Sequence, residues 1–253
     1  MLNLFSELEI INEDKILVSS NILPILIKNK KKSLKKIAND IIDELLEKVG
    51  KNGNIIIPTY NWDFCKGKKF DHHNTLSSSG ALGNIALKRD DFLRSKNPIY
   101  SFAVAGRNKI EISELNHISS FGLDSPFGYL IKNNGKNLFI NLDYKLGFTY
   151  CHVAEETVGV SYRYQKKFKG SYIDKTGNNS LKEFSMYVRD LDSGVKKTLI
   201  HKDLDNILLK YNGLKRIKND LISLDLVNIK TAYEIMVNDL KGEKKIIYTE
   251  KNE

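Results

Sequence analysis

A strand, an amphipathic helix and a second strand follow one another near the start of the chain, and this order constrains the fold more than any other feature. The run KILVSS, residues 15–20, is short, apolar and β-branched, as expected of a buried strand that ends in a loop. Residues 33–50 place apolar side chains at helical spacing, with Ser33 as N-cap and Gly50 as C-terminal stop. The run GNIIIPTY, residues 53–60, is a second continuous apolar strand. This order favours a right-handed crossover between two parallel strands.

Later segments add strands and helices to this pattern. Residues 136–143 predict a buried strand that leads into a helix beginning near Tyr150. After about residue 164 the pattern becomes more irregular. There the predicted elements are strands at residues 183–192 and 216–229 and helices at residues 201–213 and 230–241. A further buried strand is predicted earlier in the chain, at residues 99–106.

These elements predict an α/β fold with a mixed, largely parallel central sheet flanked by helices. We expect residues 1–164 to form the α/β core, which would bind the cofactor and carry catalysis. Residues 165–253 are expected to form a C-terminal α+β subdomain packed on that core.

Composition excludes several classes of protein. The 253 residues are 41% hydrophobic, enough to bury a core, so a disordered chain is excluded. The two cysteines, Cys65 and Cys151, have no metal-ligand or redox spacing, which suits a reduced compartment. The N-terminus lacks the features of a secretory signal, and no apolar run is long enough to span a bilayer. We expect a cytoplasmic protein with no membrane-inserted segment.

The formal net charge of +9 makes an anionic partner worth considering. Much of the excess lies in KNKKKSLKK, residues 28–36. Such a cluster could contact nucleic acid, anionic lipid or the phosphates of a nucleotide cofactor. It could equally be a solvated turn.

Polar residues gather just beyond the predicted strands. Ser19 and Ser20 follow the first strand, Thr59 the second, and His152 follows the strand at residues 136–143. Ligands of open α/β sheets bind beyond the carboxyl ends of the strands. His152 also precedes Glu155 and Glu156 by three and four residues, although acidic residues are common in the first turn of any helix.

Three separated segments resemble the aminoglycoside 3-N-acetyltransferase family in content and order. They are IIIPTYNWDFC…SFAVAG at residues 55–106, SSFGLDSPFGYL at 119–130 and TYCHVAEETVGVSYRY at 149–164. The resemblance covers roughly residues 13–164, more than half of the chain. It implies a mixed α/β fold and transfer of an acetyl group from acetyl-CoA, as co-substrate, to an amine.

The resemblance also implies roles for particular residues. His152 and Glu155 match the family's H-x-x-E motif, whose histidine is the base, and Ser19 and Ser20 match a segment that contacts the cofactor. Further matches and candidates are Thr75 and Ser77 before GAL and Ser101 for the cofactor, and Asp124 of DSPFG for the acceptor.

Some positions depart from the family pattern. Ser19 and Asn97 stand where the family usually has histidine, and Leu76 replaces a proline. The segment NILPILIKNKKK, residues 21–32, replaces a glycine-rich turn, so the cofactor contacts there differ from those of the family.

The reaction requires a base, because an amine is mostly ammonium at neutral pH. A neutral histidine suits this role and can contribute about 10²–10⁴ in rate. His152 is the candidate, and Glu156 could face the positive charge of the acceptor. Lys28 and Lys30 are candidates for the CoA phosphates, while Tyr60 and Trp62 could line an acceptor cleft or simply pack in the core.

Two other chemistries receive less weight. The adjacent His72 and His73 have no partner at metal-ligand spacing, so we expect no metal site there and a surface position for both. Cys151 could form an acyl-thioester, but its place beside His152 in the sequence does not establish the geometry needed. Direct transfer is therefore favoured over a ping-pong mechanism.

We predict an acetyl-CoA-dependent N-acetyltransferase acting on an amino sugar, nucleotide-linked and used for surface polysaccharide. The alternative acceptor is an aminoglycoside antibiotic. An alternative of another class is a polyanion- or nucleic-acid-binding module that uses the lysine cluster, and an inactive family member is a third. The enzyme interpretation implies no nucleic-acid partner, and oligomeric state is not predicted.

Overall fold

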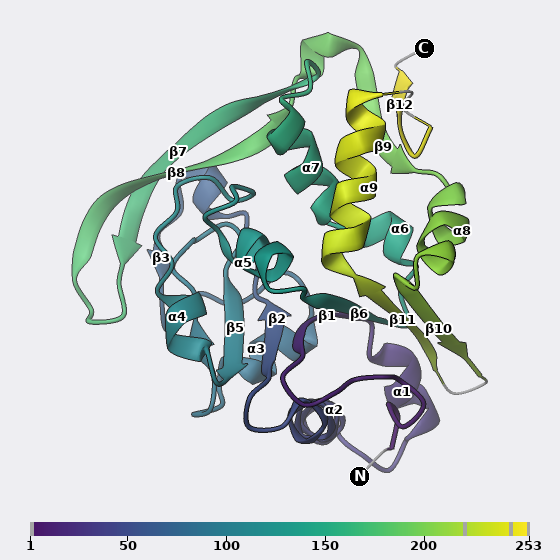
Figure 1. Ribbon diagram of the computed structural model, residues 1–253. Coiled ribbons are helices and arrows are strands. Elements are labelled where there is room, and N and C mark those ends of the chain that lie inside the picture. The colour runs from purple at the N-terminus through teal and green to yellow at the C-terminus, as the bar shows by residue number, and fades with distance from the viewer. Residues whose placement is uncertain (1–2, 220–221, 243–244, 252–253) are drawn as a thin grey trace.

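A seven-stranded mixed sheet forms the centre of the molecule. The computed structural model describes residues 3–219, 222–242 and 245–251. The strand order is β10-β11-β6-β1-β2-β5-β4 (Figure 1). In chain order these strands are β1 (Lys15–Ser20), β2 (Asn54–Pro58), β4 (Leu93–Arg94), β5 (Phe102–Gly106), β6 (Lys136–Ile140), β10 (Leu214–Lys218) and β11 (Ser223–Asn228).

Parallel pairing is confined to the middle of the sheet. Strand β1 pairs in parallel with β2 and with β6, which confirms the parallel pair predicted from the first sixty residues. The other four pairings, β2–β5, β4–β5, β6–β11 and β10–β11, are antiparallel. The sheet is mixed as predicted, but its parallel part is smaller than expected. The short connection between β10 and β11 requires an antiparallel pair, whereas β2–β5 and β6–β11 are joined by long segments whose direction the sequence pattern left open.

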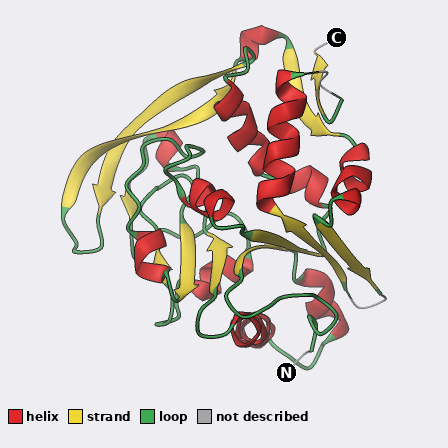
Figure 2. Ribbon diagram, viewed as in Figure 1, coloured by secondary structure: helices red, strands yellow, loops and turns green. Residues whose placement is uncertain are grey.

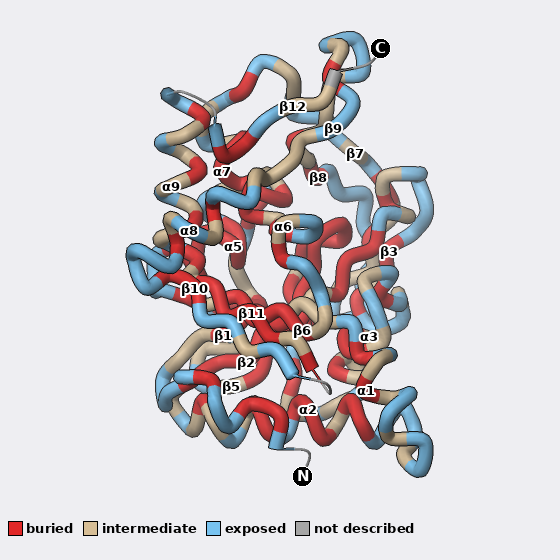
Figure 3. Tube along the Cα trace, turned by 90° about the vertical axis from the view of Figure 1, so that its right-hand side faces the viewer, coloured by how far each residue is buried: buried red, intermediate tan, exposed pale blue. Residues whose placement is uncertain are grey.

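The sheet separates two hydrophobic cores because successive strand residues point to opposite faces. On β1, Ile16 and Val18 belong to one core and Leu17 to the other. Helices α1, α2 and α3 cover the first face, and α5, α7 and α9 lie over the second (Figures 1 and 2). The buried part of the trace is concentrated between these layers (Figure 3).

The helices of the first layer are α1 (Leu23–Lys28), α2 (Leu34–Val49) and α3 (Ala81–Ala86). Helix α2 begins and ends as predicted. Ser33 caps it by accepting a hydrogen bond from the Lys36 amide, and Gly50 follows its last residue with φ of +61°. The remaining helices are α4 (Lys109–Ser113), α5 (Pro126–Lys132), α6 (Tyr144–Gly147), α7 (Tyr150–Val158), α8 (Asp203–Lys210) and α9 (Ile229–Lys241), with 3-10 turns η1 (Phe64–Lys66) and η2 (Leu191–Ser193).

The C-terminal part of the chain extends the core rather than standing apart from it. The long antiparallel hairpin of β7 (Arg163–Ile173) and β8 (Asn179–Arg189) pairs with β3 (Phe70–Asp71), and β9 (Val195–Ile200) pairs with β12 (Ile247–Lys251). Strands β10 and β11 join the central sheet, and α9 packs against α7. The predicted division after residue 164 therefore runs through one shared sheet and core. In the described ranges, no helix has the length and apolar character needed to cross a membrane.

Candidate active site

Helix α7 places His152 at the edge of the second core. Tyr150, Val153 and Ala154 of this helix are fully buried, which fixes its orientation on the sheet. The His152 side chain is 31% exposed, whereas the Glu155 side chain, one turn later, is completely buried. The helix that sequence analysis expected to begin near Tyr150 does so, with the histidine in its first turn.

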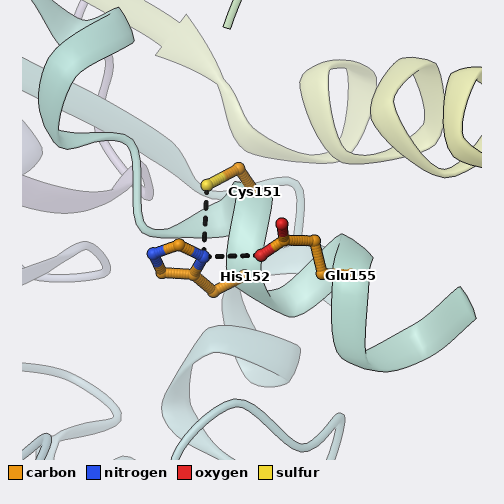
Figure 4. A group of neighbouring side chains, drawn as sticks. All are labelled: Cys151, His152 and Glu155. Carbon is orange, nitrogen blue, oxygen red and sulfur yellow. Dashed lines mark hydrogen bonds and ion pairs between the residues drawn. The ribbon is translucent and has the colours of Figure 1, made fainter. Parts of the chain in front are cut away.

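His152 and Glu155 form a close pair. His152 Nδ1 lies 2.7 Å from Glu155 Oε2 (Figure 4). The other carboxylate oxygen, Oε1, accepts hydrogen bonds from Tyr162 Oη at 3.0 Å and Thr198 Oγ1 at 2.9 Å. Arg163 Nε lies 2.7 Å from Oε2 as an ion-pair partner. Both oxygens of the buried carboxylate are therefore committed, which holds it in one orientation.

These contacts decide the charge of both residues. Burial opposes ionisation of Glu155, but hydrogen bonding to His152 and the charge of Arg163 outweigh it, so the Glu155 pKa is lowered. Burial also lowers the His152 pKa, yet the Cys151 sulfur and the Glu155 carboxylate raise it from 6.5 to about 9. At pH 7 only about one ring in a hundred is neutral in the free protein, and that neutral form is a strong base.

The thiol of Cys151 approaches the same ring nitrogen. Cys151 Sγ lies 3.4 Å from His152 Nδ1, the atom that also meets Glu155. A thiol, histidine and carboxylate relay needs the thiol and the carboxylate on opposite ring nitrogens. Here the second nitrogen, Nε2, points away from both partners (Figure 4). This geometry favours His152 as a base for an external group over activation of Cys151.

A small cavity at the carboxyl ends of β1 and β2 adjoins the start of α7. This cavity, named the serine cavity, has a volume of about 130 Å³. It is lined by Ser19, Ser20, Tyr60, Ser79, Gly83 and Thr149, among others. Ser19 and Ser20 are the last two residues of β1 rather than loop residues beyond it, and both border this cavity, as does Thr149, three positions before His152. The hydroxyl of Ser19 also accepts a hydrogen bond from Asn137 Nδ2 at 3.2 Å.

The predicted Thr75 and Ser77 do not line this cavity. Thr75 Oγ1 accepts a bond from the Asp71 amide within a turn. Ser77 Oγ lies 2.8 Å from Ser79 Oγ, which in turn donates to Pro58 O and does line the cavity. Ser79, missed by sequence reasoning, is thus the serine of this run nearest to the site. The signal that could have found it is its place directly before Gly80 and helix α3.

A larger groove that carries acidic side chains borders helix α7 at Glu156. This acidic groove has a volume of about 640 Å³. Three carboxylates, those of the predicted Asp124 and Glu156 and of Glu183, line it together with two lysines, Lys96 and Lys182. Ser119 Oγ donates to Glu156 Oε2 at 2.8 Å. Burial raises the Glu156 pKa, while hydrogen bonds from Ser119 and Gln165 oppose the rise.

The aromatic candidates differ in accessibility. Tyr60 is buried, with its ring 4.4 Å from that of Tyr100, and still lines the serine cavity. Trp62 is 40% exposed and lies edge-on to Tyr60 at 6.5 Å. Tyr60 therefore borders the serine cavity, whereas Trp62 lines neither of the two cavities in the described chain.

Ser101 and the two candidate lysines lie apart from the cavities. Ser101 is fully buried, donates to Thr59 O at 2.8 Å and accepts from Arg94 Nε at 3.1 Å, so its hydroxyl is occupied by the core. Lys28, the last residue of α1, and Lys30, two residues beyond it, are exposed and do not border the serine cavity. Their cofactor roles stay predictions.

The histidine pair at residues 72 and 73 corrects one expectation. His73 is exposed as expected, but His72 is buried. Burial is the main cause that lowers the His72 pKa to about 4, and the charge of nearby Arg94 adds to it. The turn places His72 inward because its amide pairs with Ile173 O of the β7 strand.

Comparisons with known proteins identify the family. The family model described as aminoglycoside 3-N-acetyltransferase matches residues 29–236, more than half of the chain. The chain belongs to this family. It is therefore an acetyl-CoA-dependent N-acetyltransferase, and the resemblance found in its sequence motifs is confirmed.

Solved structures of the family share the fold. Aminoglycoside acetyltransferase AAC(3)-Xa is 16% identical with a TM-score of 0.75, covering 94% of this chain and 90% of its own. AAC-IIIb in a binary complex with CoASH is 17% identical with a TM-score of 0.74, covering 97% and 95%. AAC-VIa bound to sisomicin is 14% identical with a TM-score of 0.74, covering 96% of each chain. At these identities the likeness establishes the fold alone. No curated protein sequence matches this chain.

Proposed function

We propose that this acetyltransferase moves the acetyl group of acetyl-CoA directly to an amine of an aminoglycoside-type amino sugar, with His152 as the base. The observation that carries the proposal is that helix α7, which holds the His152–Glu155 pair, has one cavity at the residue before its start and another beside its third-last residue. Thr149 borders the serine cavity three residues before His152, and Glu156 borders the acidic groove four residues after it. One helix rises about 1.5 Å per residue, so both borders lie within about 6 Å of His152 along the axis.

The donor side of the proposed site is the serine cavity. It lies beyond the carboxyl ends of β1 and β2, where ligands of open α/β sheets bind. Hydroxyls and backbone amides there could stabilise the oxyanion that forms on the thioester carbonyl. Ser20 is our candidate side chain for that role, since the Ser79 hydroxyl already donates to Pro58 O. AAC-IIIb, a structural neighbour, has been solved with CoASH.

The acceptor side is the acidic groove. Asp124, Glu156 and Glu183 outnumber the two lysines of its lining, Lys96 and Lys182, so the groove would attract an ammonium-bearing sugar. Glu183 is already paired with Lys167 at 3.0 Å, so Asp124 and Glu156 are the more available charges. AAC-VIa, another neighbour, has been solved with sisomicin.

The proposed reaction proceeds in two steps. The neutral His152 ring accepts a proton at Nε2 as the amine nitrogen attacks the thioester carbonyl, which forms the carbon–nitrogen bond and a tetrahedral oxyanion. The oxyanion then collapses, the carbon–sulfur bond breaks, and the CoA thiolate leaves with a proton returned from the imidazolium. Glu155 stabilises the imidazolium through Nδ1, at 2.7 Å, throughout both steps.

The narrower acceptor expected from the sequence has no support in the comparisons. A nucleotide-linked amino sugar for surface polysaccharide is therefore tested only as a second class of acceptor in the experiment below. The cytoplasmic location stays a prediction. The alternative of a polyanion-binding module likewise has no support from the comparisons.

The test is an acceptor screen with the wild type, His152→Ala and His152→Gln. We would measure acetyl-CoA binding by calorimetry and acetylated product by mass spectrometry, with aminoglycosides and nucleotide-linked amino sugars as acceptors. The expected result is saturable acetyl-CoA binding by all three proteins and turnover only by the wild type. Turnover by His152→Ala at more than about a tenth of the wild-type rate would contradict a base that contributes about 10² or more.

A further inference from the structure

Three kinds of metal-binding donor converge beside the first turns of α7. Cys151, His152 and Glu155 each offer one ligand atom, and these atoms lie within 4.8 Å of one another (Figure 4). The first two are adjacent in sequence and the third is one helical turn away, so the helix brings them together. The proposed reaction uses His152 and Glu155 but gives no role to the thiol of Cys151.

One of the three separations already suits a small thiophilic cation, and the other two, 2.7 Å and at most 4.8 Å, would have to adjust. Zn²⁺ binds cysteine sulfur at about 2.3 Å and histidine nitrogen or carboxylate oxygen at about 2.0–2.2 Å, so tetrahedral ligand atoms lie about 3.3–3.6 Å apart. Cys151 Sγ is already 3.4 Å from His152 Nδ1. The 2.7 Å between Nδ1 and Glu155 Oε2 would have to open by about 0.6 Å to admit the ion.

The surroundings both support and limit such a site. Tyr162 and Thr198 hold the other oxygen of Glu155, which orients the carboxylate as outer partners do in metal sites. Arg163 lies 2.7 Å from the ligating oxygen, and its positive charge opposes a second cation. We therefore expect reversible binding through three protein ligands, with the fourth position open.

We propose that Cys151, His152 and Glu155 bind a thiophilic divalent cation such as Zn²⁺, which inhibits the enzyme and is not a cofactor. The ion takes His152 Nδ1 and the Cys151 thiolate, whose proton passes to solvent. A ring that ligates through Nδ1 keeps its remaining proton on Nε2, so it cannot accept one from the acceptor amine. Inhibition, unlike binding, rests on the proposed function of His152.

The first experiment measures binding without any substrate. ZnCl₂ is titrated by calorimetry into the metal-free full-length chain, into Cys151→Ala and Cys151→Val, and into Cys65→Ala as a matched control at the only other cysteine. We expect one zinc ion per chain, with at least about tenfold weaker binding in both Cys151 variants and no change in Cys65→Ala. With CoCl₂, a thiolate-to-cobalt charge-transfer band should appear in the wild type and in Cys65→Ala only.

The second experiment measures inhibition through the acetylated product, because zinc also binds the thiol of released CoA. Zinc should inhibit the wild type and Cys65→Ala at the concentrations that fill the site, and a chelator should restore turnover. Equal zinc affinity in the wild type and both folded Cys151 variants, or a cobalt complex without the thiolate band, would overturn the site. Normal turnover at saturating zinc would overturn the inhibition alone, while zinc binding without turnover on any acceptor would refute the proposed function alone.

Discussion

Replacement of Glu155 by glutamine tests the central pair most directly. The side chain is completely buried and meets His152, Arg163, Tyr162 and Thr198. Glutamine keeps the shape and can still accept from Tyr162 and Thr198, but it removes the negative charge. The Arg163 side chain, 11% exposed, would then lack its carboxylate, and breaking such a buried pair costs about 3 kcal/mol or more of folding stability.

The same change should slow the reaction and shift its pH dependence. Without the carboxylate the imidazolium loses the partner of its Nδ1 proton, and we expect kcat to fall about 10²-fold or more. Glu155 helps to raise the His152 pKa to about 9, while Cys151 also raises it and Arg163 lowers it. The base must be neutral, so wild-type turnover should rise with pH toward 9, and Glu155→Gln should reach its plateau at lower pH.

The assay is steady-state kinetics from pH 6 to 10 at saturating acetyl-CoA, with unfolding in urea followed on the same samples. Glu156→Gln is the matched control, because it changes the next residue of the same helix and faces the acidic groove. It should raise KM for a cationic acceptor more than it lowers kcat. A folded Glu155→Gln protein with kcat within about threefold of wild type and an unshifted pH profile would refute the role of the pair.

Three further outcomes follow from other parts of the structure. His72 has a folded pKa of about 4 and an ordinary value of 6.5, with Arg94, His73 and Lys175 facing it and Glu114 opposing them. As the pH falls from 6.5 to 4 the unfolded chain takes up this proton before the folded one, so the wild type loses about 3 kcal/mol of stability through His72. His72→Phe should lack that loss, and urea unfolding at each pH would show it. Ser33→Ala removes the cap of α2 and should cost about 1 kcal/mol in the same measurement at pH 7. In Gly83→Ala the new Cβ would meet Pro58 O at 2.4 Å, so calorimetry should show weaker acetyl-CoA binding with a stability loss of about 1–3 kcal/mol.

Single helices of this fold could be predicted from the sequence because the patterns that indicate them lie within a few residues. The apolar spacing and the caps of α2 depend on residues within a few positions of one another, and helical geometry acts on such neighbours. The order of the strands does not arise this way. Strands β10 and β11, near the C-terminus, complete the sheet beside β6, and only the burial of Leu224 and Leu226 against the first core decides that place.

The same distinction between local and long-range contacts applies to the candidate site. The sequence by itself determined the pairing of His152 with Glu155, since residues three apart on a helix share one face. It held no signal for Thr198, which lies 43 residues beyond Glu155 and reaches it from β9. The tertiary structure alone decided that contact, the hydrogen bond from Ser119 to Glu156, and the two cavities next to helix α7. Contacts between distant segments depend on how the whole chain packs its layers, and no short stretch of sequence encodes that packing.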